Sequence, residues 1–497
     1  MVVLSTATTP PRAALVRSRT PQMGIFDRPT TGPALSSNFA GTIAGAALAV
    51  LVSLPSPFAV PALQPLPAYA AAKPAVAASP TTSASDRSYI NFAGFPFPLG
   101  PFTSRATVQT ELVPNRVYSF EQTLDLAGIT ANQRSVVFRM RDNHLLVYNP
   151  VAPTKEFLAQ LDGLQSKGVA HILLGATQYE HKVFVAPFAR RFPEAKVWAV
   201  PDQWSFPLDL PSPLLGIDEA KSGGGELTDT LPATSSLCTT YSGLCNAAYA
   251  RAPDLTAEFE VKLLRPKERL GFGYAANEAA LYHKDTKVLA LTDALVNVPS
   301  APPPVFVTDG GDNLRGIGDD ARRSSSLGHL ILQGASAVNW RGSAAEAVEE
   351  LWSATDAAGG AKGGAAAQLQ RGWERDALLS LFFGPSPASI VDPAPSFALL
   401  ADKWRVAPVT DTLIYRSERV KPELRRWVDD VARWDFTTIA PSHFAVRPGT
   451  PADLKTAFAP TLASCEDGAP EADRPFDAAD AQLLDDIAGP LKALKII

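Results

Sequence analysis

The chain is poor in cysteine and in histidine, and its net charge is small for its length. Only three of its 497 residues are cysteine, too few for a disulfide scaffold. Cys238 and Cys245 are close enough in sequence to pair across a Gly-containing loop, or they are two free thiols in an insertion. The net charge of −5 and the lack of a long basic run argue against a nucleic-acid partner.

Two common catalytic signatures are also missing. The sequence has no G-x-S-x-G nucleophile elbow and no G-x-x-x-x-G-K phosphate loop. Gly271-Phe272-Gly273 lacks the third glycine that a dinucleotide loop needs at its proper spacing. What the chain does have is 46% hydrophobic residues against 19% charged ones, which is enough for a large core.

The N-terminal residues 1–85 are expected to be a targeting region followed by a linker. Met1–Thr31 is rich in Ser, Thr, Pro and Arg, with Asp27 as its single acid, which is typical of an organelle transit peptide. Phe39–Leu54 is apolar and uncharged but short for a membrane span, which usually needs about 20 residues. Ala68-Tyr69-Ala70 has a small-x-small cleavage pattern. We therefore predict a chloroplast protein, in the thylakoid lumen or associated with the thylakoid membrane; a stromal transit peptide with an Ala-rich tail is the alternative.

The stretch Val169–Pro201 organises the rest of the chain. Val169–Leu174 reads as a strand buried on both faces, and Gly175–Lys182 as a polar loop. Val183–Phe192 has apolar residues at helical spacing, and Lys196–Val200 begins another buried strand. A polar loop at the carboxyl end of a buried strand is where α/β proteins place their chemistry.

Two hairpins and a capped helix surround this stretch. Arg134–Arg139 pairs with His144–Tyr148, and Thr154 is expected to cap the helix that follows. Ala279–Tyr282 pairs with Val288–Thr292 around a turn that contains His283, which we expect to be exposed. The folded domain is predicted to occupy 86–460, with insertions near 217–255 and 305–370 and a C-terminal tail with a short helix over 461–497.

Polar side chains follow three separate predicted strands. They are Glu180 and His181, then Asp293, then His443. This pattern resembles the metallo-β-lactamase fold, and more closely its plastid and cyanobacterial DUF4336-type branch. The segments that carry the closer resemblance are EHKVF, FARRFPEAKVW, QWSFPLDLP, LYHKDTKVLALTD, RGW and PSHF. The resemblance implies an α/β (α+β) fold, an αββα sandwich of two mixed sheets with helices outside.

The same resemblance indicates that one of two metal sites has been lost. The positions of the first two histidines of the parent motif hold Ala176 and Gln178, and the third ligand would lie near Tyr274. The positions of the second site hold Glu180, His181, Asp293 and His443, with only an aspartate-to-glutamate change. Two imidazoles and two carboxylates suit a single Zn, Fe or Mn ion. The alternative is a metal-free cluster in which these polar groups bind one another.

Two functions follow from these alternatives. The first is a metal-dependent hydrolase with one ion at the four-residue site and an unknown small-molecule substrate. The second is a non-catalytic binding or assembly protein of the plastid, with a plastid protein as its partner, that retains the fold without metal.

Overall fold

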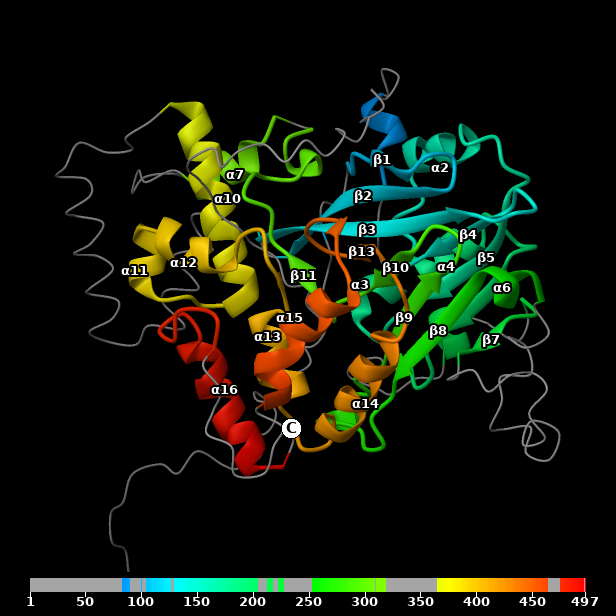
Figure 1. The fold of residues 1–497 in the computed structure, drawn as a ribbon. Helices are drawn as coiled ribbons and strands as arrows, with labels where there is room; N and C mark the ends of the chain where they lie inside the picture. Colours follow the sequence, from blue (N-terminus) through cyan, green and yellow to red (C-terminus); the bar gives the residue numbers. More distant parts are fainter. Residues whose placement is uncertain are drawn as a thin grey trace, which may run out of the picture. The chain divides into compact units, whose positions relative to one another are not determined.

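A computed structural model of the chain (Figure 1) describes residues 83–89, 100, 104–126, 129–203, 212–217, 222–227, 253–308, 310–318, 364–463, 474–495 and 497. Contacts between Cα atoms divide the chain into Met1–Thr42 and Ile43–Ile497, and all of these residues belong to the second unit. The predicted transit peptide and the loop with Cys238 and Cys245 lie outside the described residues. No described helix is both long and apolar enough to cross a membrane.

The first sheet has seven strands in sequence order. The first four strands are antiparallel neighbours, and the last three continue the sheet in parallel. They are β1 (Val108–Val113), β2 (Val117–Leu126), β3 (Ile129–Arg139), β4 (Leu145–Tyr148), β5 (Val169–Leu174), β6 (Lys196–Ala199) and β7 (Gly225–Glu226). This confirms the predicted hairpin of β3 with β4 and the two buried strands β5 and β6.

The second sheet has five strands in the order β14-β13-β10-β9-β8, again of mixed direction. The predicted hairpin is formed by β9 and β10, and β13 lies parallel to β10 on its other side. The strands are β8 (Phe259–Leu264), β9 (Glu278–His283), β10 (Val288–Leu291), β13 (Thr438–Pro441) and β14 (Arg447–Pro448). A separate two-stranded pair joins β11 (Val296–Asn297) to β12 (Trp404–Arg405).

Helices complete the sandwich on the outer sides of the sheets (Figure 1). The longer ones are α2 (Lys155–Asp162), α10 (Ala365–Phe382), α14 (Lys421–Val431), α15 (Pro451–Ala463) and α16 (Gln482–Ala493). The shorter ones are α3 (Tyr179–Lys182), α4 (Val185–Ala189), α6 (Pro253–Glu258), α7 (Asp312–Ile317), α11 (Pro387–Val391), α12 (Ala394–Leu400) and α13 (Pro408–Thr410). Thr154 caps α2 as predicted, because its side chain accepts a hydrogen bond from the Phe157 N–H.

The apolar residues divide into three layers. One cluster lies between the sheets and joins residues such as Leu146 on β4 to Leu281 on β9. Val147, the residue after Leu146 in β4, belongs instead to the cluster under α2 and α4, because successive strand residues point to opposite faces. A third cluster packs Leu289 of β10 against the helices α10, α14 and α15. The order helix, sheet, sheet, helix confirms the predicted αββα sandwich.

Two local expectations were inaccurate. Tyr179–Lys182 was expected to be loop, but it forms the helical turn α3, and α4 ends at Ala189 rather than at Phe192. The turn places Glu180 and His181 on a rigid element directly after β5, which matters for the site described next.

Candidate metal centre

Four side chains from the ends of three strands meet at one edge of the sandwich. Glu180 and His181 lie on α3, which follows β5 of the first sheet. Asp293 follows β10 and His443 follows β13, which are parallel neighbours in the second sheet. Each of the four residues offers one ligand atom, and these atoms all lie within 4.8 Å of one another. The structure therefore brings together all four predicted site residues.

The distances between these atoms match those around a single ion. The Nε2 atoms of His181 and His443 are 3.3 Å apart. Asp293 lies 3.4 Å from His181 through Oδ2 and 3.3 Å from His443 through Oδ1. Ligands bound at about 2.1 Å to one tetrahedral ion lie about 3.4 Å from each other. The Glu180 carboxylate is slightly farther, with 3.7 Å between its Oε1 and the His181 Nε2.

The cluster is buried and incompletely hydrogen-bonded. Glu180 and His181 are 0% exposed, and the Asp293 side chain, at 12%, is the most accessible of the four. Both carboxylate oxygens of Glu180, the Nδ1 of His181 and the Oδ2 of Asp293 make no hydrogen bond with any residue that the structure describes. A buried polar group without a partner costs about 1–3 kcal/mol, and more if it is charged. A metal-free cluster would have to bear several such costs, whereas a bound cation would remove them for the carboxylate oxygens.

Burial also governs protonation in this cluster. Burial, together with the nearby charge of Asp293, raises the pKa of Glu180 well above its usual range. Burial lowers the pKa of His181, so its neutral form is favoured. Burial alone would raise the pKa of Asp293, but the two imidazoles outweigh this and hold the pKa below its usual range. Without metal, burial thus favours the neutral forms of Glu180 and His181, whereas the imidazoles favour the charged form of Asp293.

The tautomer of His443 leaves a nitrogen free for a metal. Its Nδ1 lies 2.7 Å from the backbone carbonyl of Asn132. A carbonyl oxygen can only accept, so Nδ1 carries a proton, and Nε2, which lies beside His181 and Asp293, is the nitrogen that the neutral ring can offer to a metal. A backbone carbonyl that fixes the ring in this way is common behind metal-bound histidines.

Asn149 ties the three ligand-bearing segments together. Its Oδ1 accepts a hydrogen bond from the Gly175 N–H at 2.7 Å, just before the α3 segment. Its Nδ2 donates to the hydroxyls of Thr292 and Ser442, both at 3.0 Å, and these residues directly precede Asp293 and His443. From the sequence, Asn149-Pro150 indicated only the end of a strand. Its partners lie up to 293 positions away, so no local signal could have revealed this role.

A buried arginine fixes the turn that carries His443. Arg134 forms an ion pair with Glu121 at 2.9 Å and donates to the carbonyls of Pro441 and Phe444 on either side of the histidine. Phe444 has a positive φ of 57°, which costs energy for a bulky residue. Asn132 holds this conformation, because its side chain accepts from the Phe444 N–H at 2.7 Å and donates to the Phe444 carbonyl at 2.9 Å.

Glu278 holds the turn that carries Asp293. Its carboxylate accepts from the backbone N–H groups of Thr292, Asp293 and Ala294 at 2.8 to 3.2 Å. Burial and the Asp293 charge raise the pKa of Glu278 to about 8, against the effect of these hydrogen bonds. Glu278 therefore orients Asp293 from behind without joining the ligand set.

The positions expected for a first metal site carry no metal ligand. Ala176 and Tyr274 are buried, and Gln178 is almost fully buried beside them. The Tyr274 hydroxyl interacts with Thr177, and the charge of Glu180 adds to the effect of burial in raising the pKa of Tyr274. These residues therefore lie near the four-residue cluster. No further histidine accompanies them in the part of the chain that the structure describes. The site is suited to one ion.

The expectation that His283 is exposed was wrong. Its side chain is 0% exposed and packs against Phe138 and Phe259, at ring-centroid distances of 5.3 and 4.7 Å. Glu258 and Asp285 complete a second group of metal-type ligands around it. Arg116, however, lies 3.4 Å from the His283 Nε2 and pairs with both carboxylates. Because a cation already occupies this position, the second group is a charge network and not a metal site.

Other histidines have structural partners. His171 is buried, accepts from the Trp198 indole at 3.0 Å and contacts Asp254 at 2.9 Å. His144 pairs with Asp142 at 2.7 Å near the surface. His329 lies outside the described residues.

Comparison with solved structures finds metallo-β-lactamases and flavodiiron cores. A metallo-β-lactamase from Pontibacter korlensis is 10% identical, with a TM-score of 0.29 over 73% of this chain and 100% of that one. A mono-zinc metallo-β-lactamase from Pseudomonas aeruginosa is 10% identical, with a TM-score of 0.27 over 77% and 96%. The Flv1 flavodiiron core from Synechocystis is 8% identical, with a TM-score of 0.34 over 72% and 61%. At these values the matches carry no information on activity.

Among curated proteins, no match is found. A family model described as a domain of unknown function, DUF4336, matches residues 114–398 and 392–459, which together are more than half of the chain. The matched range contains all four ligands of the metal centre and most of both sheets. The chain therefore belongs to the DUF4336 family.

Proposed function

We propose that the chain binds one Zn, Fe or Mn ion through Glu180, His181, Asp293 and His443 and acts as a metal-dependent hydrolase. The observation that carries this proposal is the convergence of four buried ligand atoms within 4.8 Å, at spacings that suit one tetrahedral ion. The oxygens of Glu180 and Asp293 that have no hydrogen-bond partner among the described residues support it, because a bound cation would interact with them.

A metal of this kind, when bound, supplies Lewis acidity for the hydrolysis of an ester or amide bond. The surrounding residues have separate tasks. His443 keeps its proton on Nδ1, towards Asn132. Glu278 and Asn149 hold the turns before Asp293 and His443, so that the ligands need little rearrangement to bind. Asp293 is the most exposed ligand, so a substrate would approach the centre from its side.

The burial of the ligands favours a second candidate, a non-catalytic plastid protein in which the site is structural. Structural metal sites are closed by four protein ligands, whereas catalytic sites keep one position open. Here four ligands are available, and three of them are almost completely buried. Such a protein would retain the fold for binding or assembly, with a plastid protein as its partner.

Metal analysis of the purified full chain is the first test. We expect about one equivalent of a transition metal in the wild type and a large loss of it in His181→Ala and in His443→Ala. His144→Ala is the matched control, because this histidine lies near the surface and pairs only with Asp142. Wild-type protein that takes up no metal after dialysis against Zn, Fe(II) or Mn would refute metal binding.

Activity separates the two candidates. The metal-loaded chain is compared with the chelated chain on chromogenic esters, amides and phosphodiesters. Metal-dependent turnover that disappears in His443→Ala supports the hydrolase. One bound equivalent of metal with no turnover on any of these substrates supports the structural role. Plastid import of a fluorescent fusion, followed by N-terminal sequencing of the mature protein, tests the proposed location.

A further inference from the structure

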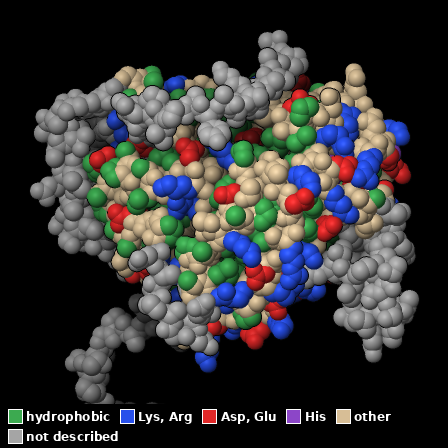
Figure 2. Space-filling model, viewed as in Figure 1, with side chains coloured by type: hydrophobic (Ala, Val, Ile, Leu, Met, Phe, Trp, Pro, Cys, Tyr) green, Lys and Arg blue, Asp and Glu red, His purple; other side chains and the backbone are tan. Residues whose placement is uncertain are grey.

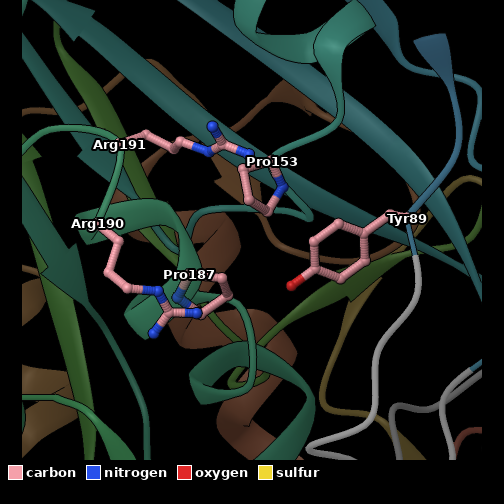
Figure 3. A pocket seen from close by; sticks show the side chains of 5 residues that line it. All are labelled: Tyr89, Pro153, Pro187, Arg190 and Arg191. Atoms are coloured by element: carbon pink, nitrogen blue, oxygen red, sulfur yellow. The ribbon is translucent and has the colours of Figure 1, made fainter.

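A cationic pocket lies beside α4 and shares no residue with the metal centre. It has a volume of about 370 Å³ and is lined by Tyr89, Pro153, Pro187, Arg190 and Arg191 (Figure 3). Arg190 and Arg191 follow the last turn of α4, Pro187 lies within that helix, and Pro153 precedes α2. The pocket is within the size range that small-molecule sites occupy.

The charge of this pocket is not neutralised by the described residues. The side chains of Arg190 and Arg191 form no ion pair or hydrogen bond with them, whereas most other described arginines have an acidic or carbonyl partner. None of the described residues that line the pocket is acidic. In Figure 3 the two guanidinium groups lie on either side of the space, and the Tyr89 hydroxyl points into it between them. Three groups that can donate hydrogen bonds therefore face the same volume.

Aromatic contacts orient one wall of the pocket. The Tyr89 ring packs edge-on against the Phe184 ring at a centroid distance of 5.8 Å. The Arg105 guanidinium lies 5.2 Å from the centroid of the same Phe184 ring. These contacts orient the phenol towards the arginines. The pyrrolidine rings of Pro153 and Pro187 add apolar surface that does not need to be ordered on binding.

We propose that this pocket binds a phosphomonoester, a small molecule that carries a phosphate group on an apolar body. Guanidinium groups match phosphate oxygens with paired hydrogen bonds, and a phenol supplies one further donor. The proline rings and the phenol ring would contact the apolar body. The pocket is independent of the metal centre, so this binding site does not rest on the proposed hydrolase activity.

The test is calorimetric titration of the full chain with phenyl phosphate, in the presence of a chelator to exclude binding through metal. We expect saturable binding that is tighter than that of inorganic phosphate or of benzoate, and that weakens as salt is added. Arg190→Gln and Arg191→Gln should each weaken binding about tenfold, and Tyr89→Phe a fewfold, because each removes donors to the phosphate.

Arg433→Gln is the matched control, since it removes an exposed arginine on the chain segment after α14, far along the sequence from the pocket. Both pocket arginines are exposed, so their variants should fold, which circular dichroism checks. Unchanged phenyl phosphate binding in Arg190→Gln and Arg191→Gln would overturn the proposal. So would an absence of saturable binding to the wild type, or an equal loss in Arg433→Gln.

Discussion

The amide nitrogen of Asn149 donates a hydrogen bond to the hydroxyl of Ser442 at 3.0 Å, and this bond joins the first sheet to the second beside His443. The same amide also contacts Thr292 and Gly175. One buried side chain therefore sets the relative positions of the segments that carry the four ligands. On the face shown in Figure 2, basic and acidic side chains are interspersed.

Removal of the Asn149 side chain should disturb both stability and metal binding. Asn149→Ala leaves the Gly175 N–H and the Ser442 hydroxyl without this partner, while the Thr292 hydroxyl keeps Tyr148, so we expect the free energy of unfolding to fall by about 2–4 kcal/mol. Metal affinity should fall by about 10–100-fold, because supporting residues of this type contribute at that level. Denaturant unfolding and metal titration measure the two effects.

Asn149→Asp is the informative comparison. A carboxylate still accepts from the Gly175 N–H, and the hydroxyl of Ser442 can rotate to donate to it. This variant should retain most of the metal affinity that Asn149→Ala loses. Equal affinity in the wild type and in Asn149→Ala would show that the three segments are positioned by something else.

A methyl group at Gly175 should displace a ring behind the site. A Cβ at this position would overlap the phenol of Tyr148, which is fully buried and hydrogen-bonds to Thr292 and the Ala279 carbonyl. We expect Gly175→Ala to cost about 1–3 kcal/mol, as overpacking usually does. Gly489→Ala is the control, because a Cβ there meets no atom within 4 Å, and alanine inside helix α16 should stabilise by about 0.5–1 kcal/mol relative to glycine. Thermal or denaturant unfolding measures the stability of both variants, and an unchanged stability of Gly175→Ala would contradict the predicted overlap with Tyr148.

The pKa of Glu180 makes the stability of the metal-free chain depend on pH. Because its pKa is raised in the folded state, folding favours the protonated form. This contribution is fully present below about pH 4.5 and is lost as the pH rises towards the folded pKa. One such group lowers the free energy of unfolding by at most about 1.4 kcal/mol per pH unit. Glu180→Gln, which stays neutral, should flatten the decline that the wild type shows between pH 5 and 8.

Glu268→Gln is the control for this measurement, since its side chain is largely exposed. It should leave the pH dependence as it is in the wild type. A wild-type chain whose stability does not decrease over this range, measured by denaturant unfolding with a chelator present, would contradict a raised pKa of Glu180.

Histidines at the two substituted positions should not create a second metal site. Ala176→His combined with Gln178→His supplies two imidazoles, but the third expected ligand position still holds the buried Tyr274. We therefore expect no more than one metal ion per chain by elemental analysis. Two ions per chain in this double variant would show that another residue replaces the ligand assigned to the Tyr274 region.

Many of the strands could be predicted from local patterns in the sequence, whereas the sandwich fold and the four candidate ligands were implied by the family resemblance. Buried strands such as β5 are short apolar runs, and each ligand directly follows a strand. The prediction for His283 failed because Lys284 and Asp285 suggested a surface turn, whereas Phe138 and Phe259 cover the imidazole from other strands. The roles of Asn149 and Arg134 were missed for the same reason, since their partners lie about 300 positions away.

The candidate ligands leave the ribosome far apart in time, because His443 follows His181 by 262 positions in the chain. A nascent chain that has exposed only its first sheet presents one imidazole and one carboxylate, a pair too weak to retain an ion against cellular competitors. If the chain binds an ion as proposed, tight binding has to wait until β13 and His443 after it are in place. Metal binding would then indicate that the domain has folded. A protein that delivers the metal could load this chain only after nearly the whole domain has been translated.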